Sequence, residues 1–281
     1  MSGTPERRTV QANGIDYSYM EYGDPGAPPV ILMHGIWSTG AVWHDVATTL
    51  APEFRVLTID WRGRSHTGWA PDGDYSTDAY VADLRGLYDA WGLERATLVG
   101  HSMGGNNAIY FTGAHAEMVQ SLVVVDMGPE MGRGRSVGEF ERQMAALGQE
   151  FPSWAAARAW QRTALPNISD AAVERRLEAR LTERDGRVVW REDPAIRGHR
   201  DRSAPPDNEA RWAAFRAVPC RTLFILGANS PLVTAEVERQ LVDTLPDASA
   251  VRIPDAGHNV FEDSPEPFNA ALLEFLRANT G

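Results

Sequence analysis

The strongest indication of the fold is the stretch Ala96-Thr-Leu-Val-Gly-His-Ser-Met-Gly-Gly105. A short apolar run, typical of a buried strand, leads directly into the pattern G-x-S-x-G, and a helical stretch follows at 106–114. This order predicts a tight strand-to-helix turn that exposes the hydroxyl of Ser102 at the end of a sheet. Glycine is needed at positions 100 and 104 because neighbouring backbone comes too close for a β-carbon. A purely structural turn is the alternative, but the context favours a nucleophile.

Strand and helix patterns alternate on both sides of this turn. Asn13-Gly14 predicts a hairpin between two strands near the N-terminus. Apolar strands are expected at 29–33, 55–59, 122–125, 221–226 and 251–253, and helices at 42–50, 77–91, 106–114, 234–245 and 265–277. The alternation predicts an α/β fold with a mostly parallel sheet.

The alternation stops between residues 130 and 216. This segment holds sixteen arginines and fourteen acidic residues, has a helical pattern and contains no run that indicates a buried strand. We therefore expect a core of residues 1–129 and 217–281 that carries a helical insertion over residues 130–216.

Composition excludes several functional classes. The 281 residues include 27 basic and 38 acidic residues, a net charge of −11, which argues against a nucleic-acid partner. Every basic residue is arginine, so lysine Schiff-base chemistry is impossible. No apolar run approaches the roughly 20 residues of a membrane span, and Cys220 is the only cysteine. We expect a cytoplasmic monomer or homodimer that acts on a small molecule, without a membrane partner.

A catalytic serine needs a base and an orienting acid. His258 follows the last expected strand, and Asp126 ends an apolar strand 24 residues after Ser102. Strand ends on one edge of a parallel sheet converge, so the three residues can meet. The alternatives are a surface-loop role for His258 and a helix- or loop-capping role for Asp126.

The negatively charged intermediate of acyl transfer needs backbone N–H donors. The residue after the nucleophile, Met103, should supply one of them. The second should come from the loop that follows strand 29–33, at Ile36 or Trp37. A simple turn at His34-Gly35 is the alternative.

Together these residues resemble the α/β-hydrolase superfamily over nearly the whole chain. His34-Gly35 with Trp43 resembles its oxyanion loop, residues 60–67 resemble D-x-R-G-x-G-x-S, and residues 257–266 resemble its histidine loop. The resemblance implies an eight-stranded, mostly parallel sheet, a helical cap in the 130–216 insertion and a Ser-Asp-His triad.

One departure from the family pattern concerns the acid. Members usually carry it after the seventh strand, but here that stretch reads Gly227-Ala-Asn-Ser-Pro231, with proline at the acid's place. A minority of members place the acid after the sixth strand, where Asp126 stands. Either Asp126 completes a working triad, or the triad is degraded and the protein binds ligands with slow or no turnover.

A serine nucleophile suits acyl transfer and needs no metal or organic cofactor. The expected activity is hydrolysis of a small carboxylic ester, lactone or thioester. The alternatives are hydrolysis of an amide or carbon–carbon bond in an acidic small molecule, and ligand binding alone. The candidates for lining the substrate pocket are Trp37, His101, Trp190, Arg191 and Asn259.

The insertion's relative positive charge raises a further hypothesis. One or more of its arginines could bind a substrate carboxylate, since the guanidinium fork matches that group. The candidates are Arg133, Arg135, Arg142, Arg162 and Arg191. Arginines paired with local acids on exposed helices are the simpler interpretation for any single one of them.

Overall fold

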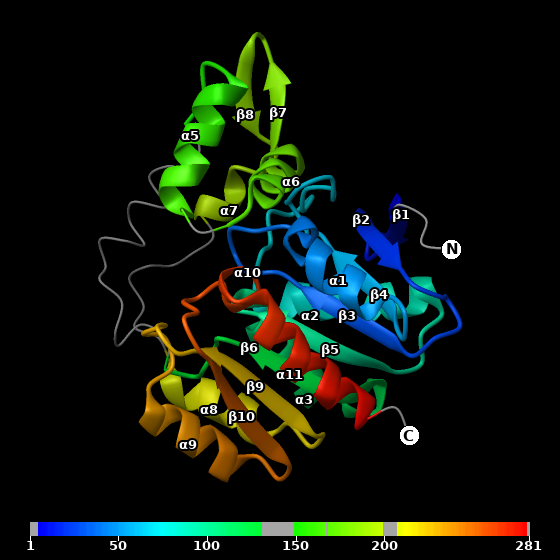
Figure 1. Cartoon of the computed structure of the whole chain (residues 1–281). Coiled ribbons are helices and arrows are strands. Elements are labelled where there is room, and N and C mark those ends of the chain that lie inside the picture. The colour runs from blue at the N-terminus through cyan, green and yellow to red at the C-terminus, as the bar shows by residue number, and fades with distance from the viewer. Residues whose placement is uncertain (1–4, 131–148, 167, 199–206, 280–281) are drawn as a thin grey trace.

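An eight-stranded sheet forms the centre of the molecule in a computed structural model that describes residues 5–130, 149–166, 168–198 and 207–279 (Figure 1). Its order is β1-β2-β4-β3-β5-β6-β9-β10, in which β2 runs antiparallel to both neighbours and every other pair is parallel. The expected mostly parallel eight-stranded sheet is thus confirmed. The strands are β1 Arg7–Ala12, β2 Ile15–Tyr22, β3 Pro29–Met33, β4 Arg55–Ile59, β5 Ala96–His101, β6 Val119–Val125, β9 Thr222–Gly227 and β10 Ala248–Ile253.

The expected N-terminal hairpin forms between β1 and β2. Asn13 and Gly14 both have positive φ, at 51° and 77°, as the favoured two-residue hairpin turn requires.

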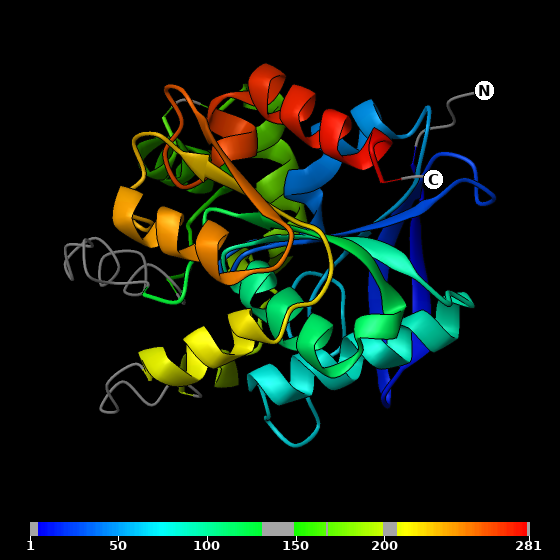
Figure 2. The same ribbon diagram turned by 90° about the horizontal axis from the view of Figure 1, so that it is seen from below.

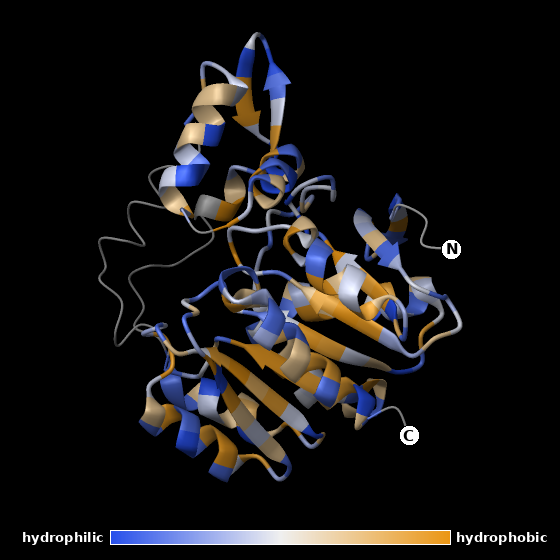
Figure 3. Ribbon diagram, in the orientation of Figure 1, coloured by the Kyte–Doolittle hydropathy of each residue, from blue (hydrophilic) through white to orange (hydrophobic). Residues whose placement is uncertain are grey.

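Helices cover both faces of the sheet, because the central strands are apolar on both sides (Figures 2 and 3). Alternate residues along one strand enter different cores: Leu98 packs in one cluster and Val99 in the other. The first cluster includes residues of α2 (Thr77–Trp91), α3 (Met103–Ala114), α8 (Asn208–Arg216) and α9 (Ala235–Thr244). The second includes residues of α1 (His44–Leu50), α10 (Val260–Asp263) and α11 (Pro265–Arg277).

A separate layer lies beyond the carboxyl edge of the sheet (Figure 1). It has its own cluster of buried apolar side chains, which includes Phe151, Val173, Leu177 and Trp190. Its described elements are α5 (Trp154–Ala164), α6 (Asp170–Arg180), β7 (Leu181–Arg184), β8 (Arg187–Trp190) and α7 (Ala195–Gly198).

Two features of this region differ from the sequence-based expectation. First, β7 and β8 form a hairpin where only helices were expected, because Asp185 and Gly186 turn with positive φ and Val188 and Trp190 are buried on alternate positions. The pair Asp185-Gly186 is a hairpin signal in the sequence. The strands beside it are too short and polar to be predicted as buried strands.

Second, α8 lies with the core, although the expected insertion extended to residue 216. Phe215 of α8 is 1% exposed and stacks on Phe224 of β9, with 6.2 Å between the ring centres. Burial of this ring against the sheet holds the helix beside α3.

No helix within the described ranges combines the length and apolar character that crossing a membrane would require.

Candidate active site

Ser102 lies at the turn between β5 and α3 with φ 53° and ψ −114°, a backbone conformation that residues other than glycine rarely adopt. Two close backbone approaches surround this turn. A β-carbon on Gly100 would lie 2.4 Å from the carbonyl oxygen of Gly104, and one on Gly104 would lie 2.4 Å from that of Met33. The glycines therefore let α3 begin directly against the ends of β3 and β5.

The structure brings His258 and Asp126 together across 132 residues of sequence. His258 Nδ1 lies 2.7 Å from Asp126 Oδ2, and Asp126 is fully buried at the end of β6. The side chain of His258 is 23% exposed. In the structure as described, Ser102 and His258 form no hydrogen bond with each other. Such contacts are often long without substrate and tighten when it binds.

Asp126 receives two further hydrogen bonds from the stretch that carries the proline. The N–H of Gly227 donates to Oδ1 at 3.1 Å, and the hydroxyl of Ser230 donates to Oδ2 at 2.5 Å. The segment after β9, which lacks an acid of its own, thus holds the carboxylate that β6 supplies. A buried carboxylate needs such partners, because an unpaired charge in the core is costly.

His101 lies beneath the histidine loop and is 4% exposed. Its Nε2 is 2.9 Å from the carbonyl oxygen of His258, and the two ring centres are 4.5 Å apart. Burial, reinforced by the neighbouring His258, lowers the pKa of His101 well below its usual value, so its ring is neutral. This placement gives His101 a supporting position under the histidine loop, whereas sequence placed it among the pocket candidates.

The loop after β3 passes directly beside the nucleophile. A β-carbon on Gly35 would lie 3.3 Å from the β-carbon of Ser102. The backbone N–H groups of Ile36 and Met103 donate no hydrogen bond to any residue that the structure describes. They are therefore available for an oxygen bound at Ser102.

His34 fixes the start of this loop. Its Nδ1 is 2.7 Å from the carbonyl oxygen of Gly35, and its Nε2 accepts from the N–H of Trp61 at 3.1 Å. Complete burial lowers the pKa of His34 to about 3, and the charges of Arg64, Arg180 and Arg176 also lower it. The neutral ring joins the ends of β3 and β4.

The remaining pocket candidates divide between the oxyanion loop, the histidine loop and the upper layer. Trp37 packs against the buried cluster of the upper layer. Asn259 directly precedes α10, and its carbonyl oxygen accepts from the backbone N–H groups of Glu262 and Asp263. Trp190 is 9% exposed and donates to the carbonyl oxygen of Gln149, while Arg191 donates to that of Leu181. These bonds of Trp190 and Arg191 brace the upper layer itself.

Two arginines that the sequence analysis did not single out lie close to the site. They are Arg176 and Arg180 of α6, which are 5% exposed. Of the earlier candidates, Arg162 forms an ion pair with the exposed Asp170, and Arg133, Arg135 and Arg142 lie outside the described residues.

Both arginines of α6 are paired. Arg176 Nε donates to Glu262 on α10 at 2.9 Å, and Arg180 Nη2 donates to Glu192 at 2.9 Å. Arg180 also stacks on Trp190, with its Cζ 4.4 Å from the ring centre. The Nη1 atom of each makes no hydrogen bond with the described residues, so each guanidinium keeps a free donor.

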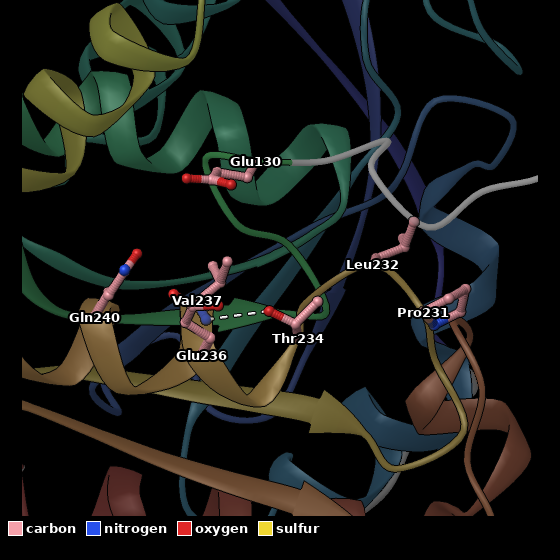
Figure 4. A pocket seen from close by; sticks show the side chains of 7 residues that line it. All are labelled: Glu130, Pro231, Leu232, Thr234, Glu236, Val237 and Gln240. Carbon is pink, nitrogen blue, oxygen red and sulfur yellow. Dashed lines mark hydrogen bonds between the residues drawn. The ribbon is translucent and has the colours of Figure 1, made fainter.

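A cavity of about 180 Å³ lies away from Ser102, between α9 and Glu130, which follows β6 (Figure 4). Figure 4 shows its lining side chains, Glu130, Pro231, Leu232, Thr234, Glu236, Val237 and Gln240, none of which belongs to the site around Ser102. In the described part of the chain, no three His, Cys, Asp or Glu side chains gather as a metal site would require.

Sequence reasoning missed the residues that support the site. The stretch that contains Gly227 and Ser230 was considered only because it lacks the usual acid. Arg64, Arg176 and Arg180 were not singled out. The spacing of Arg176 and Arg180, four residues apart beside the apolar Val173 and Leu177, was a signal that both lie on a buried helix face.

Comparison with known proteins identifies the family of this chain. The family model for the alpha/beta hydrolase fold matches residues 28–265. The chain is 30% identical over 284 residues to an sn-1-specific diacylglycerol lipase of Mus musculus, covering 98% of this chain and 89% of the lipase. It is 28% identical over 271 residues to a 2-(acetamidomethylene)succinate hydrolase of Mesorhizobium japonicum, covering 96% and 95% of the two chains.

A solved structure shows the same architecture. The crystal structure of E-2-(acetamidomethylene)succinate hydrolase superposes with a TM-score of 0.86 at 27% identity, covering 98% of this chain and 100% of the other. The chain is therefore a hydrolase that belongs to the α/β-hydrolase fold family.

Proposed function

We propose that this protein is a serine hydrolase that cleaves a small carboxylic ester, lactone or thioester through an acyl-enzyme. His258 takes the proton of Ser102 as its Oγ attacks the carbonyl carbon, and then returns it to the leaving group. Asp126 orients the imidazole and stabilises its positive form. Water, deprotonated by His258, then attacks the acyl carbon and releases the acid and Ser102.

The observation that carries this proposal is the 2.7 Å contact between His258 Nδ1 and Asp126. It leaves Nε2 of the same ring for the serine proton, which is the arrangement that general-base catalysis needs. The free N–H groups of Ile36 and Met103 support it, because they flank the nucleophile where negative charge develops on the substrate oxygen. The lipase among the relatives is consistent with an ester substrate.

The test is hydrolysis of p-nitrophenyl esters from acetate to octanoate by wild type and Ser102→Ala. We expect turnover in wild type and a loss of at least about 10³-fold in the variant. The chain-length profile then measures the size of the acyl site. Tight binding of these esters without turnover in wild type would instead indicate a ligand-binding protein.

A second candidate is hydrolysis of an amide bond in an acidic small molecule. The observation that favours it is the position of Arg176 and Arg180, whose charges reach His34 beneath the site. Each has a free Nη1 donor, and a guanidinium suits a carboxylate. The name of the relative from Mesorhizobium japonicum specifies an acetamido group on a succinate, which combines these two features.

Paired substrates separate the two candidates. Phenyl acetate and its 4-carboxyphenyl analogue differ in one carboxylate. An N-acylated aminosuccinate tests hydrolysis of the amide bond. If Arg176 and Arg180 bind the substrate's charge, Arg180→Gln should raise KM for the anionic compounds about tenfold and leave the neutral ester within about twofold. Equal effects on both esters would contradict carboxylate recognition. Arg158→Gln, on exposed α5, is the matched control.

A further inference from the structure

We propose that Arg64 is the positioning residue of the oxyanion hole, a role that rests on the serine-hydrolase function proposed above. Its guanidinium joins the two segments that carry the candidate N–H donors, the loop after β3 and the start of α3. Nε donates to the carbonyl oxygen of Ile36 at 3.0 Å, and Nη2 lies 3.8 Å from Sδ of Met103. Arg64 comes from a third segment, the loop after β4, so one side chain ties three parts of the site together.

The guanidinium is itself held rigidly. Arg64 is 1% exposed, and its Nη1 donates to the hydroxyl of Tyr80 at 2.7 Å and to the carbonyl oxygen of Arg62 at 3.2 Å. Tyr80 lies on α2, whose apolar face is part of the core. Since the fork is planar and anchored on both sides, it can fix the direction of the Ile36 carbonyl.

The Ile36 carbonyl shares its peptide plane with the N–H of Trp37, so the bond from Arg64 sets the direction of that N–H. In a trans peptide, the C=O and the N–H point in opposite directions. His34 Nδ1 binds the carbonyl oxygen of Gly35, which orients the N–H of Ile36, and Arg64 binds that of Ile36, which orients the next peptide plane. Together, two side chains hold two successive peptide planes beside Ser102, with their carbonyls turned back into the protein.

The charge of Arg64 is also uncommitted. Among the residues that the structure describes, it forms no ion pair, whereas its neighbour Arg62 pairs with Asp83. A buried cation without a carboxylate is costly. Negative charge on a tetrahedral intermediate at Ser102 would compensate it, so Arg64 should stabilise the transition state more than the bound substrate.

The variants Arg64→Lys and Arg62→Lys test this role. Arg62 belongs to the same loop and is 3% exposed, but its guanidinium faces Asp83 and not the loop after β3. For the best p-nitrophenyl ester, Arg64→Lys should lower kcat by roughly 10- to 100-fold with KM within about twofold. A trifluoromethyl ketone, which forms an oxyanion adduct on the serine, should bind weaker by the same factor as kcat/KM falls. Arg62→Lys should change neither constant by more than about threefold.

The outcomes separate a positioning role from a structural one. If Arg64→Lys melts lower but keeps kcat and the inhibitor constant, or loses no more than Arg62→Lys, the proposal is overturned. If that variant is not recovered folded, Tyr80→Phe, which removes an acceptor of Nη1, replaces it. A parallel loss of kcat and inhibitor affinity in Tyr80→Phe supports the role, and unchanged values overturn it. Activity that survives in Ser102→Ala would refute the hydrolase mechanism instead.

Discussion

Asp126 is a buried carboxylate that three groups from distant parts of the chain hold in place. His258, Ser230 and the N–H of Gly227 all contact its two oxygens. The residue itself sits at the end of β6 with φ 47°, a conformation that L-residues other than Asn and Asp seldom take. Such a conformation is kept only where the surrounding contacts determine it, as they do here.

Replacing Asp126 or its partner Ser230 should slow catalysis, but to different degrees. Asp126→Asn should lower kcat by about 10³- to 10⁴-fold, because the imidazole loses its orienting anion. Ser230→Ala removes one hydrogen bond to a charged group and should cost roughly 10-fold. Both are measured on the same ester, with melting curves to verify folding. A loss in Ser230→Ala that equals or exceeds that in Asp126→Asn would contradict this ranking.

Helix α3 illustrates how one element serves both stability and chemistry. Its first turn must approach the ends of β3 and β5 so closely that glycine is required, while a β-carbon in its last turn, at Gly113, would make only an ordinary contact with the connection to β9. The glycines at positions 104 and 113 therefore meet opposite requirements. A β-carbon on Gly104 meets the backbone of Met33 at 2.4 Å, but one on Gly113 meets only Ala217 at 3.4 Å.

Alanine should have opposite effects on stability at positions 104 and 113. Gly104→Ala should lower the free energy of unfolding by about 1–3 kcal/mol through overpacking, and displace Ser102 enough to reduce kcat at least about tenfold. Gly113→Ala should raise the free energy of unfolding by up to about 1 kcal/mol, since alanine favours the helix. Urea unfolding and ester hydrolysis measure both. Equal effects at the two sites would show that backbone proximity does not explain the glycine at 104.

His34 and His101 are both buried in neutral form below the site. Burial lowers the pKa of both, to about 3 for His34. In the unfolded chain, each would titrate near 6.5. Above that pH both states carry neutral rings, so nothing is lost. Below it the unfolded state binds protons that the folded state does not, and this difference lowers stability as pH falls.

We therefore expect the free energy of unfolding to decrease as pH falls from about 6.5 toward 3. The slope from each buried histidine is at most about 1.4 kcal/mol per pH unit. Urea unfolding at pH 7.5, 6.0 and 5.0 measures it. His34→Asn should have a shallower slope, because the unfolded variant lacks that proton site. A stability that is flat between pH 7.5 and 5.0 would contradict the expectation.

Outside residues 130–216, the order of strands and helices can be predicted from the sequence, and so can the three residues proposed for catalysis. The reason is that these signals are local. Strand alternation, helix periodicity and the glycines of a tight turn depend on neighbours within a few residues, and Ser102, Asp126 and His258 each follow a strand whose pattern is clear. The parallel sheet then brings such strand ends to one edge.

The side chains that support these three residues can be identified only from the folded structure. Ser230 binds Asp126, Arg64 binds the loop at Ile36, and α6 brings two arginines over the site. In the same way, Phe215 places α8 with the core rather than in the insertion. Each of these contacts joins residues far apart in the chain through the packing of whole elements, and no local pattern encodes which distant partner a buried polar group will find.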